Sequence, residues 1–230
     1  MCIRDSNGFP ITLEQFHELF TMKIEKLLIE HGFIVIKNSF AGGGFGARYE
    51  KNIHKGKFFL AIVCEKKNGF MLGVIFRIIE DNMIAIAKKS DFQYSMENGG
   101  GIFLSFDGVL QLKERLCINN HKTFEEFVVL LKQSILKWSD AVKDIKSIDA
   151  LINGDIDKAI KNHVHSSVYA PFALIAARLA ENPNFDELAV SLGTYGAGSG
   201  RAWGKFNYAE VAVGWPKLVK YLREEVKPLV

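Results

Sequence analysis

Residues 57–80 read KFFLAIVCEKKNGFMLGVIFRIIE, two apolar runs separated by a short polar segment that contains Asn68-Gly69. Asn-Gly between runs rich in β-branched and aromatic residues is a strong short-range signal for a β-hairpin. The stretch therefore predicts two antiparallel strands, at residues 57–65 and 70–80, joined by a tight turn.

Further short strands are predicted on both sides of this hairpin, at residues 33–37, 47–51, 83–87, 101–106 and 109–112. A glycine-rich turn over residues 38–46 is expected between the first two of them. Parallel strands need a crossover of about a dozen residues or more, so connections as short as these predict antiparallel neighbours.

A helix is predicted before the strands. Thr12 and Gln15 have the spacing of a capping box at its start. Gly32 follows its last turn, in the position where a glycine commonly ends a helix.

The second half of the chain has the spacing of helices. Thr123 and Glu126 predict a second capping box, and apolar residues recur at helical spacing from Phe124 to Ile145, with Trp138 expected in the core. Three signals mark the helices that follow: Pro171 and Pro216 are expected in first turns, and Gly193 is expected to end a helix. These helices are predicted at 156–164, 171–180, 185–192 and 216–227, with a strand at 206–213.

Strands in the first half and helices in the second predict an α+β fold. We expect an N-terminal helix packed on an antiparallel β-meander, followed by a mostly helical C-terminal half. Residues 7–120 are expected to hold the helix and the sheet, and residues 121–230 a helical half that shares their core, so that 7–230 could form one single domain. Residues 1–6, MCIRDS, resemble a translated sequencing adapter, which predicts a scar from metagenomic sequence assembly.

The composition is that of a globular protein: 230 residues, 48% hydrophobic, 24% charged, with a net charge of +3. These values exclude a disordered or collagen-like chain, and the charge is mild for a dedicated nucleic-acid binder. Cys2, Cys64 and Cys117 form no CxxC pair, which favours a reducing, cytoplasmic location and argues against a disulfide framework or a zinc site. No apolar stretch is long enough for a membrane span, and no cofactor or metal is predicted.

The most unusual stretch runs from Gly193 to Arg201, where glycines alternate with other small residues. Glycine-rich backbone lets N–H groups converge on an anion, and an arginine adds a charge-assisted hydrogen bond. The candidate ligand-binding residues are Gly196, Gly198, Ser199, Gly200 and Arg201, with Arg48 as a further charge. The alternative for this stretch is a flexible loop or a turn that permits tight packing.

The sequence holds no convergent Ser/His/Asp, Cys/His or metal-ligating set, so no catalytic residue is predicted and enzymatic activity is left open. We expect a non-enzymatic protein-binding protein, which resembles in general type the immunity and accessory proteins of bacterial toxin or phage-defence loci. One alternative is an enzyme or binder of an anionic small molecule or nucleotide that uses the Gly193 to Arg201 stretch. Another is a weak nucleic-acid binder that uses six lysines near strand ends, namely Lys55, Lys57, Lys66, Lys67, Lys88 and Lys89. The oligomeric state is left open.

Overall fold

The computed structural model describes residues 11–41, 44–67, 69–90, 102–105, 117–154, 170–198 and 208–229. The chain groups into two compact units. Unit 1 comprises Met1–Asn52, Phe58–Phe76 and Ser105–Ala141, and unit 2 comprises Ile53–Lys57, Arg77–Leu104 and Val142–Val230. The predicted scar at residues 1–6 lies outside the described residues, and the predicted boundary near residue 120 remains a prediction.

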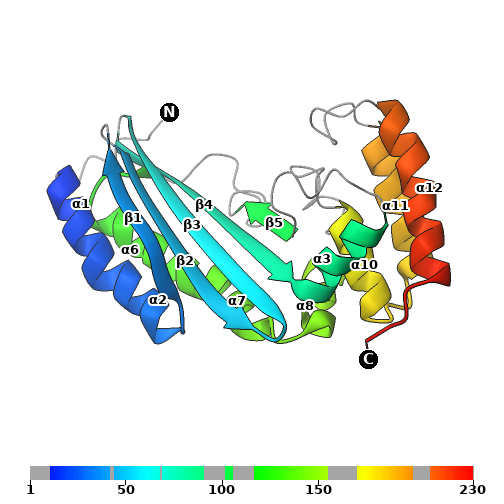
Figure 1. Cartoon of the computed structure of the whole chain (residues 1–230). Helices are drawn as coiled ribbons and strands as arrows, with labels where there is room; N and C mark the ends of the chain where they lie inside the picture. The colour runs from blue at the N-terminus through cyan, green and yellow to red at the C-terminus, as the bar shows by residue number, and fades with distance from the viewer. Residues whose placement is uncertain are drawn as a thin grey trace. The chain divides into compact units, whose positions relative to one another are not determined.

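Within the described residues, six strands form one sheet, and Figure 1 shows the long ones side by side. They are β1 (Ile34–Ala41), β2 (Gly44–Ile53), β3 (Gly56–Lys67), β4 (Gly69–Glu80), β5 (Ile102–Ser105) and β6 (Cys117–Ile118). The strand order is β1-β2-β3-β4-β5, and β6 pairs with β4. The predicted α+β fold, with an N-terminal helix, an antiparallel meander and a mostly helical C-terminal half, is confirmed.

The hairpin predicted at residues 57–80 is confirmed as β3 and β4. The turn predicted over residues 38–46 is wrong in extent, because antiparallel pairing continues to the pair Ala41 and Gly44. The register of β1 on β2 shifts once, between Val35 and Lys37. This β-bulge places one extra residue of β1 opposite β2.

The strand predicted at residues 83–87 is wrong: the chain forms helix α3 (Asp81–Lys89). Glu80 caps this helix, since its carboxylate accepts the N–H of Met83 at 2.8 Å. Met83 and Ala87, one helical turn apart, are both buried. The apolar spacing and the cap therefore favour a helix over a strand.

The predicted N-terminal helix is present as α1 (Leu13–Leu19), the π-helical segment η1 (Phe20–Glu25) and α2 (Lys26–Glu30). Thr12 and Gln15 form the predicted capping box. The ring of Phe16 stacks on that of Phe70 of β4, with centroids 4.6 Å apart. This contact confirms that the helix packs on the sheet.

Gly32 ends this helix as predicted, with φ +82°. Its N–H donates to the carbonyl of Ile29 at 2.9 Å, and the N–H of Phe33 donates to that of Leu28 at 3.0 Å. These two bonds form a Schellman motif, which requires the left-handed backbone that glycine adopts most readily. The motif places His31 at the end of the helix and directs the chain into β1.

Helix α6 (His121–Leu131) begins three residues before the start that a cap at Thr123 predicts. Asn120 is its N-cap and accepts the N–H of Thr123 at 3.0 Å, while the hydroxyl of Thr123 accepts the N–H of Asn120 at 3.2 Å. Thr123 is thus the third residue of the helix rather than its cap, because asparagine is at least as good an N-cap as threonine.

The predicted stripe from Phe124 to Ile145 is not one helix. The π-helical segment η2 (Lys132–Leu136) follows α6, α7 (Lys137–Ala141) completes the rod, and Asp144 caps a separate helix, α8 (Ile145–Asn153). A π turn inserts an extra residue and rotates the next turns of the helix about its axis. Ser139 is therefore buried, whereas Trp138, predicted to be largely buried, is partly exposed, with its ring 5.4 Å from that of Phe76.

Unit 2 is built around α10 (Ala170–Leu179), a helix that is buried along nearly its whole length. A helix that is apolar on all sides needs neighbours on all sides, and α10 contacts α3, α8, α11 (Phe185–Gly198) and α12 (Tyr208–Glu224). Pro171 lies in its first turn, as predicted. The helix predicted at residues 156–164 lies outside the described residues.

Helix α12 overturns two predictions. The described part of the predicted strand at 206–213 is helical, and Pro216 lies inside the helix rather than in its first turn. The side chains of Trp215, Leu218 and Leu222 are buried. Their packing stabilises the helix although proline removes one backbone hydrogen bond.

The two described cysteines, Cys64 and Cys117, differ in their bonding. Cys64 is free and buried, as expected of a small apolar side chain. Cys117 is disulfide-bonded, whereas the sequence predicted no disulfide framework. The cytoplasmic location inferred from sparse cysteines stays a prediction. Across the described ranges, no helix has both the length and the apolar character that crossing a bilayer demands.

Candidate functional site

The structure places only part of the predicted anion-binding set. Arg48 is exposed on β2 of unit 1. Gly196 and Gly198 belong to helix α11 of unit 2, and the remaining members, Ser199, Gly200 and Arg201, lie outside the described residues. A site that joins these residues therefore remains a prediction.

Gly193 does not end its helix, because α11 continues to Gly198. A Cβ on Gly193 would lie 2.4 Å from Nε1 of Trp215. The indole N–H of Trp215 donates to the carbonyl of Ala189, one turn earlier in α11, at 2.9 Å. Gly193 thus permits the indole of α12 to pack on the backbone of α11, within a helix rather than in the loop or turn considered for this stretch.

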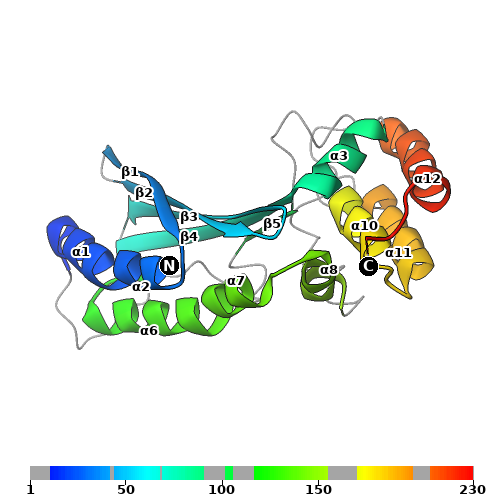
Figure 2. The same cartoon turned by 60° about the horizontal axis from the view of Figure 1, so that its bottom comes forward.

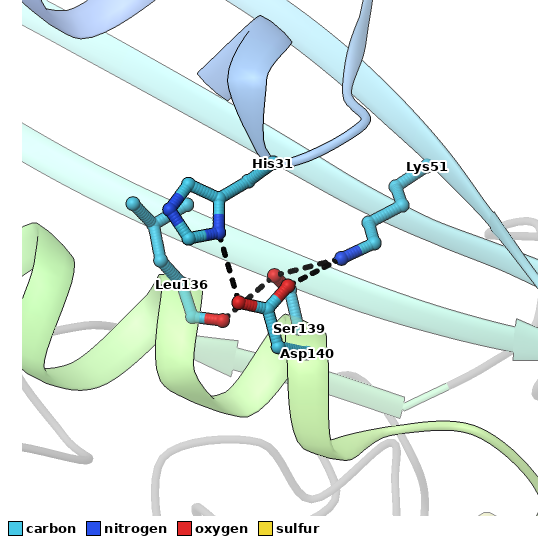
Figure 3. Close-up of polar contacts among 5 residues, drawn as sticks. All are labelled: His31, Lys51, Leu136, Ser139 and Asp140. Carbon is cyan, nitrogen blue, oxygen red and sulfur yellow. Dashed lines mark hydrogen bonds and ion pairs between the residues drawn. The ribbon is translucent and has the colours of Figure 1, made fainter. Parts of the chain in front are cut away.

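A polar cluster in unit 1 joins three elements, and Figure 3 shows its side chains converging on one carboxylate. Asp140 of α7 contacts His31, at the end of α2, through Oδ2 and Nδ1 at 2.8 Å. Its other oxygen accepts a hydrogen bond from Lys51 of β2 at 2.6 Å. The Lys51 ammonium also lies 5.7 Å from the ring centroid of Phe33.

The charges in this cluster favour an ionised aspartate. Partial burial acts to raise the pKa of Asp140, but the hydrogen bonds from Lys51 and His31, together with their charges, hold it below its usual value. The carboxylate therefore stays negative while the Lys51 side chain is mostly withdrawn from water. Such a pair contributes stability, which solvent screening reduces because Asp140 is half exposed.

The pair of Asp140 and His31 resembles the arrangement that orients a general base in hydrolases. A hydrolase of that type also needs a nucleophile. The hydroxyl drawn in this cluster, Ser139 Oγ, is buried and donates to the carbonyl of Leu136 at 2.9 Å. The cluster therefore fits a clamp between α2, β2 and α7 better than a reaction centre, and no group of metal-ligating side chains is found among the described residues.

A buried polar group lies in unit 2. Asp149 of α8 accepts hydrogen bonds from the side-chain amides of Asn153 and Asn182, both at 2.7 Å. Asn153 also donates to the carbonyl of Ala173 in α10 at 2.9 Å. Desolvation raises the pKa of Asp149 although both amides act to lower it. These bonds join α8 to α10 and to the turn after α10, which is a structural role.

Unit 1 has a sheet with one helix-covered face. Alternate residues of a strand point to opposite faces. The residues on one face of β3 and β4 are fully buried, namely Phe58, Leu60, Ile62, Cys64, Leu72, Val74 and Phe76. Figures 1 and 2 show that α1, α2, α6 and α7 all lie on the same side of β1–β4.

The opposite face, here named the open face, consists of Ile34, Ile36, Arg48, Glu50, Phe59, Ala61, Val63, Gly73 and Ile75. Four of its aliphatic side chains are 43–57% exposed, namely Ile34, Ile36, Val63 and Ile75. Single exposed apolar residues are normal, but a group on one sheet face marks an interaction surface. The open face is therefore the candidate functional site.

The sequence of β3 carries a signal for this face, an uninterrupted apolar run. The run Phe58–Cys64 is apolar at every position rather than at alternate positions. Strands that read this way are typically covered on both faces. In unit 1 the described helices cover one face only.

No protein-family model, no curated protein and no solved structure matches this chain.

Proposed function

We propose that this chain is a non-enzymatic protein-binding protein, of the accessory type expected from its sequence, and that it binds through the open face of unit 1. One observation carries the proposal: Ile34, Ile36, Val63 and Ile75 stand 43–57% exposed together on a regular antiparallel sheet. Each of these side chains gains roughly 1–2 kcal/mol when it leaves water completely. A folded protein surface that is apolar at its centre would supply that burial.

Three features favour a protein over a small ligand. The open face lies on hydrogen-bonded antiparallel strands, so it is already ordered before binding and loses little entropy. Its apolar side chains are β-branched and stiff. Arg48 and Glu50 lie between the apolar residues of β1 and those of β3, which gives the surface the polar contacts that set orientation in protein interfaces.

The test uses the tagged full chain co-expressed with the products of the genes that flank its own, followed by titration calorimetry on the purified pair. Val63→Lys and Ile75→Lys should each weaken binding by at least about tenfold, because each places a charge in the apolar part of the interface. Binding by the unchanged chain should have a negative heat-capacity change.

Val129→Lys and Ile29→Lys are matched controls, because these side chains are as exposed, at 48% and 53%, but belong to helices α6 and α2. They should leave binding unchanged. If no protein, including a second copy of the chain, binds in a way that Val63→Lys or Ile75→Lys weakens, the proposal is wrong.

A further inference from the structure

Gly73 lies in the middle of β4 and on the open face, because its neighbours Leu72 and Val74 are buried on the helix-covered face. The surrounding residues 70–76, FMLGVIF, are otherwise apolar and suit a strand. Glycine inside a strand weakens it, and commonly marks a bulge or a place where another group approaches the backbone closely. Burial alternates without interruption over residues 72–78, so no bulge in that stretch accounts for Gly73.

The described chain supplies no other reason for a glycine at this position. The φ of Gly73 is not in the left-handed region that favours glycine, unlike that of Gly32. Apart from the residues next to it in the chain, one described atom lies within 4 Å of the place that a Cβ on Gly73 would take, namely the carbonyl oxygen of Val63 at 3.9 Å. That distance is an ordinary van der Waals contact, so the described fold has room for a side chain here.

Other glycines of the chain differ from Gly73 in this respect. Gly56, Gly154 and Gly193 each have a reason within the chain, because a Cβ on them would lie 2.1, 2.5 and 2.4 Å from a neighbouring atom. At Gly73 the group that requires close approach therefore comes from beyond the described residues.

Two aliphatic side chains stand beside the exposed backbone of Gly73. Val63 is its neighbour on β3, and Ile75 follows it on the same face of β4. They are 43% and 44% exposed, and both are β-branched, so their positions are fixed before anything binds. A group that reaches the backbone of Gly73 therefore meets stiff apolar walls on two sides.

We propose that the protein bound by the open face places an aromatic side chain directly on the backbone of β4 at Gly73, between Val63 and Ile75. The inference rests on the proposed function and names the kind of partner, a protein that presents an exposed tryptophan, tyrosine or phenylalanine.

An aromatic ring fits this place for three reasons. Rings pair favourably with β-branched side chains on sheet surfaces, and Val63 and Ile75 supply two of them. A ring is large but has few rotatable bonds, so it loses little entropy when it is fixed. Interfaces also draw most of their affinity from a few aromatic side chains that fill well-packed positions.

The first test measures the free chain. Gly73→Ala and Gly73→Val should have a melting temperature equal to or higher than that of the unchanged chain, because the fold has room for a Cβ and both residues suit a strand better than glycine. A lower melting temperature for Gly73→Ala would show that the chain itself needs the glycine or covers it, and would overturn the inference.

The second test uses N-acetyl-tryptophanamide as the probe and the ¹⁵N-labelled full chain as the target. Millimolar titration should give saturable chemical-shift changes at the amides of Val63, Gly73 and Ile75. Gly73→Val should lose these changes, because its side chain occupies the place of the ring. Lys132→Ala, at an exposed residue of η2, is the control and should keep them.

N-acetyl-leucinamide is the comparison probe in the same titration. It should produce smaller changes at these amides, because it offers an apolar side chain without a ring. Changes of equal size with both probes would overturn the choice of an aromatic group. Changes that Gly73→Val leaves intact, or none at these amides, would overturn the site.

The protein partner identified for the open face provides the third test. Gly73→Val should weaken its binding by at least about tenfold while the fold stays as stable as before. If Val63→Lys weakens that binding and Gly73→Val does not, the inference is wrong and the proposed function stands. If the probe binds as expected but no protein does, the proposed function is wrong, and with it the assignment of the ring to a protein partner.

Discussion

At the scale of single residues, two aspartates show how surroundings decide what a carboxyl group does. Asp140 has a cationic partner in Lys51, and its pKa lies below the usual value. Asp149 is buried with two neutral amides, and its pKa is raised chiefly by desolvation. The first group therefore stabilises the fold above the unfolded pKa of about 3.8 and ceases to do so as the pH falls through its folded pKa. For the second group the sign is opposite.

Asp149→Asn tests that opposite sign. A carboxyl group whose folded pKa is raised contributes stability below its unfolded pKa of 3.8 and loses that contribution as the pH rises through the folded pKa. The unfolding free energy of the unchanged protein, minus that of Asp149→Asn, should therefore fall as the pH rises from 3.8 through the folded pKa. The fall is about 1.4 kcal/mol for each unit by which the folded pKa is raised. Urea unfolding at several pH values measures it, and a difference that grows with pH would contradict the prediction.

At the scale of elements, helix lengths and ends depend on contacts that lie far away in the sequence. Glycine is common just after the last turn of a helix, so the sequence alone predicts that Gly193 ends its helix. In the structure the indole N–H of Trp215 donates to the carbonyl of Ala189, and the helix continues past Gly193. In α6 to α7, a π turn rotates the last residues, so that Ser139 rather than Trp138 is fully buried.

Gly193→Ala tests this contact between α11 and α12. Helix propensity alone would favour alanine over glycine by about 1 kcal/mol. The added Cβ would lie 2.4 Å from Nε1 of Trp215, a ring that is itself buried and hydrogen-bonded. We therefore expect a net loss of about 1–3 kcal/mol in unfolding free energy. Ser191→Ala in the same helix is the control, and a stabilised Gly193→Ala variant would show that α12 moves away at little cost.

At the scale of the whole molecule, the two units share strand β4, because the boundary between them falls between Phe76 and Arg77 inside that strand. Cooperative units often coincide with supersecondary motifs, and the β3–β4 hairpin contributes residues to both units. We therefore expect the chain to unfold in one cooperative transition, in line with the single domain considered from the sequence.

Leu174→Ala tests this cooperativity. Leu174 is fully buried in α10 of unit 2, so its truncation should cost about 2–5 kcal/mol. Native-state hydrogen exchange should then show reduced protection of the slowest amides in unit 1 as well, by the same free energy. Unit 1 amides that keep their protection while those of unit 2 lose it would show two independently unfolding parts.

Local chemistry allowed much of the fold to be predicted from sequence alone. The capping box at Thr12, the left-handed glycine at Gly32 and the pairing of the two strands within residues 57–80 depend on contacts between residues close in the chain, and all three are confirmed. The strand predicted at 83–87 failed because its apolar spacing fits either element, and the cap supplied by Glu80 decides between them. The prediction that Pro216 lies in the first turn of a helix failed for a different reason, because the packing of α12 outweighs the hydrogen bond that proline removes.

The candidate site depended on tertiary structure throughout. The sequence determined that the strands are apolar, that they pair antiparallel and that Arg48 is a charged residue near them. Only the folded sheet decided which face the helices cover, and hence that Ile34, Ile36, Val63 and Ile75 are left exposed on the other. The physical reason is that alternation along a strand defines two faces, whereas the choice of the covered face is made by helices distant in the chain. The same holds for Asp140, His31 and Lys51, whose meeting follows from the packing of α2 and α7 on the sheet and from no pattern in the sequence.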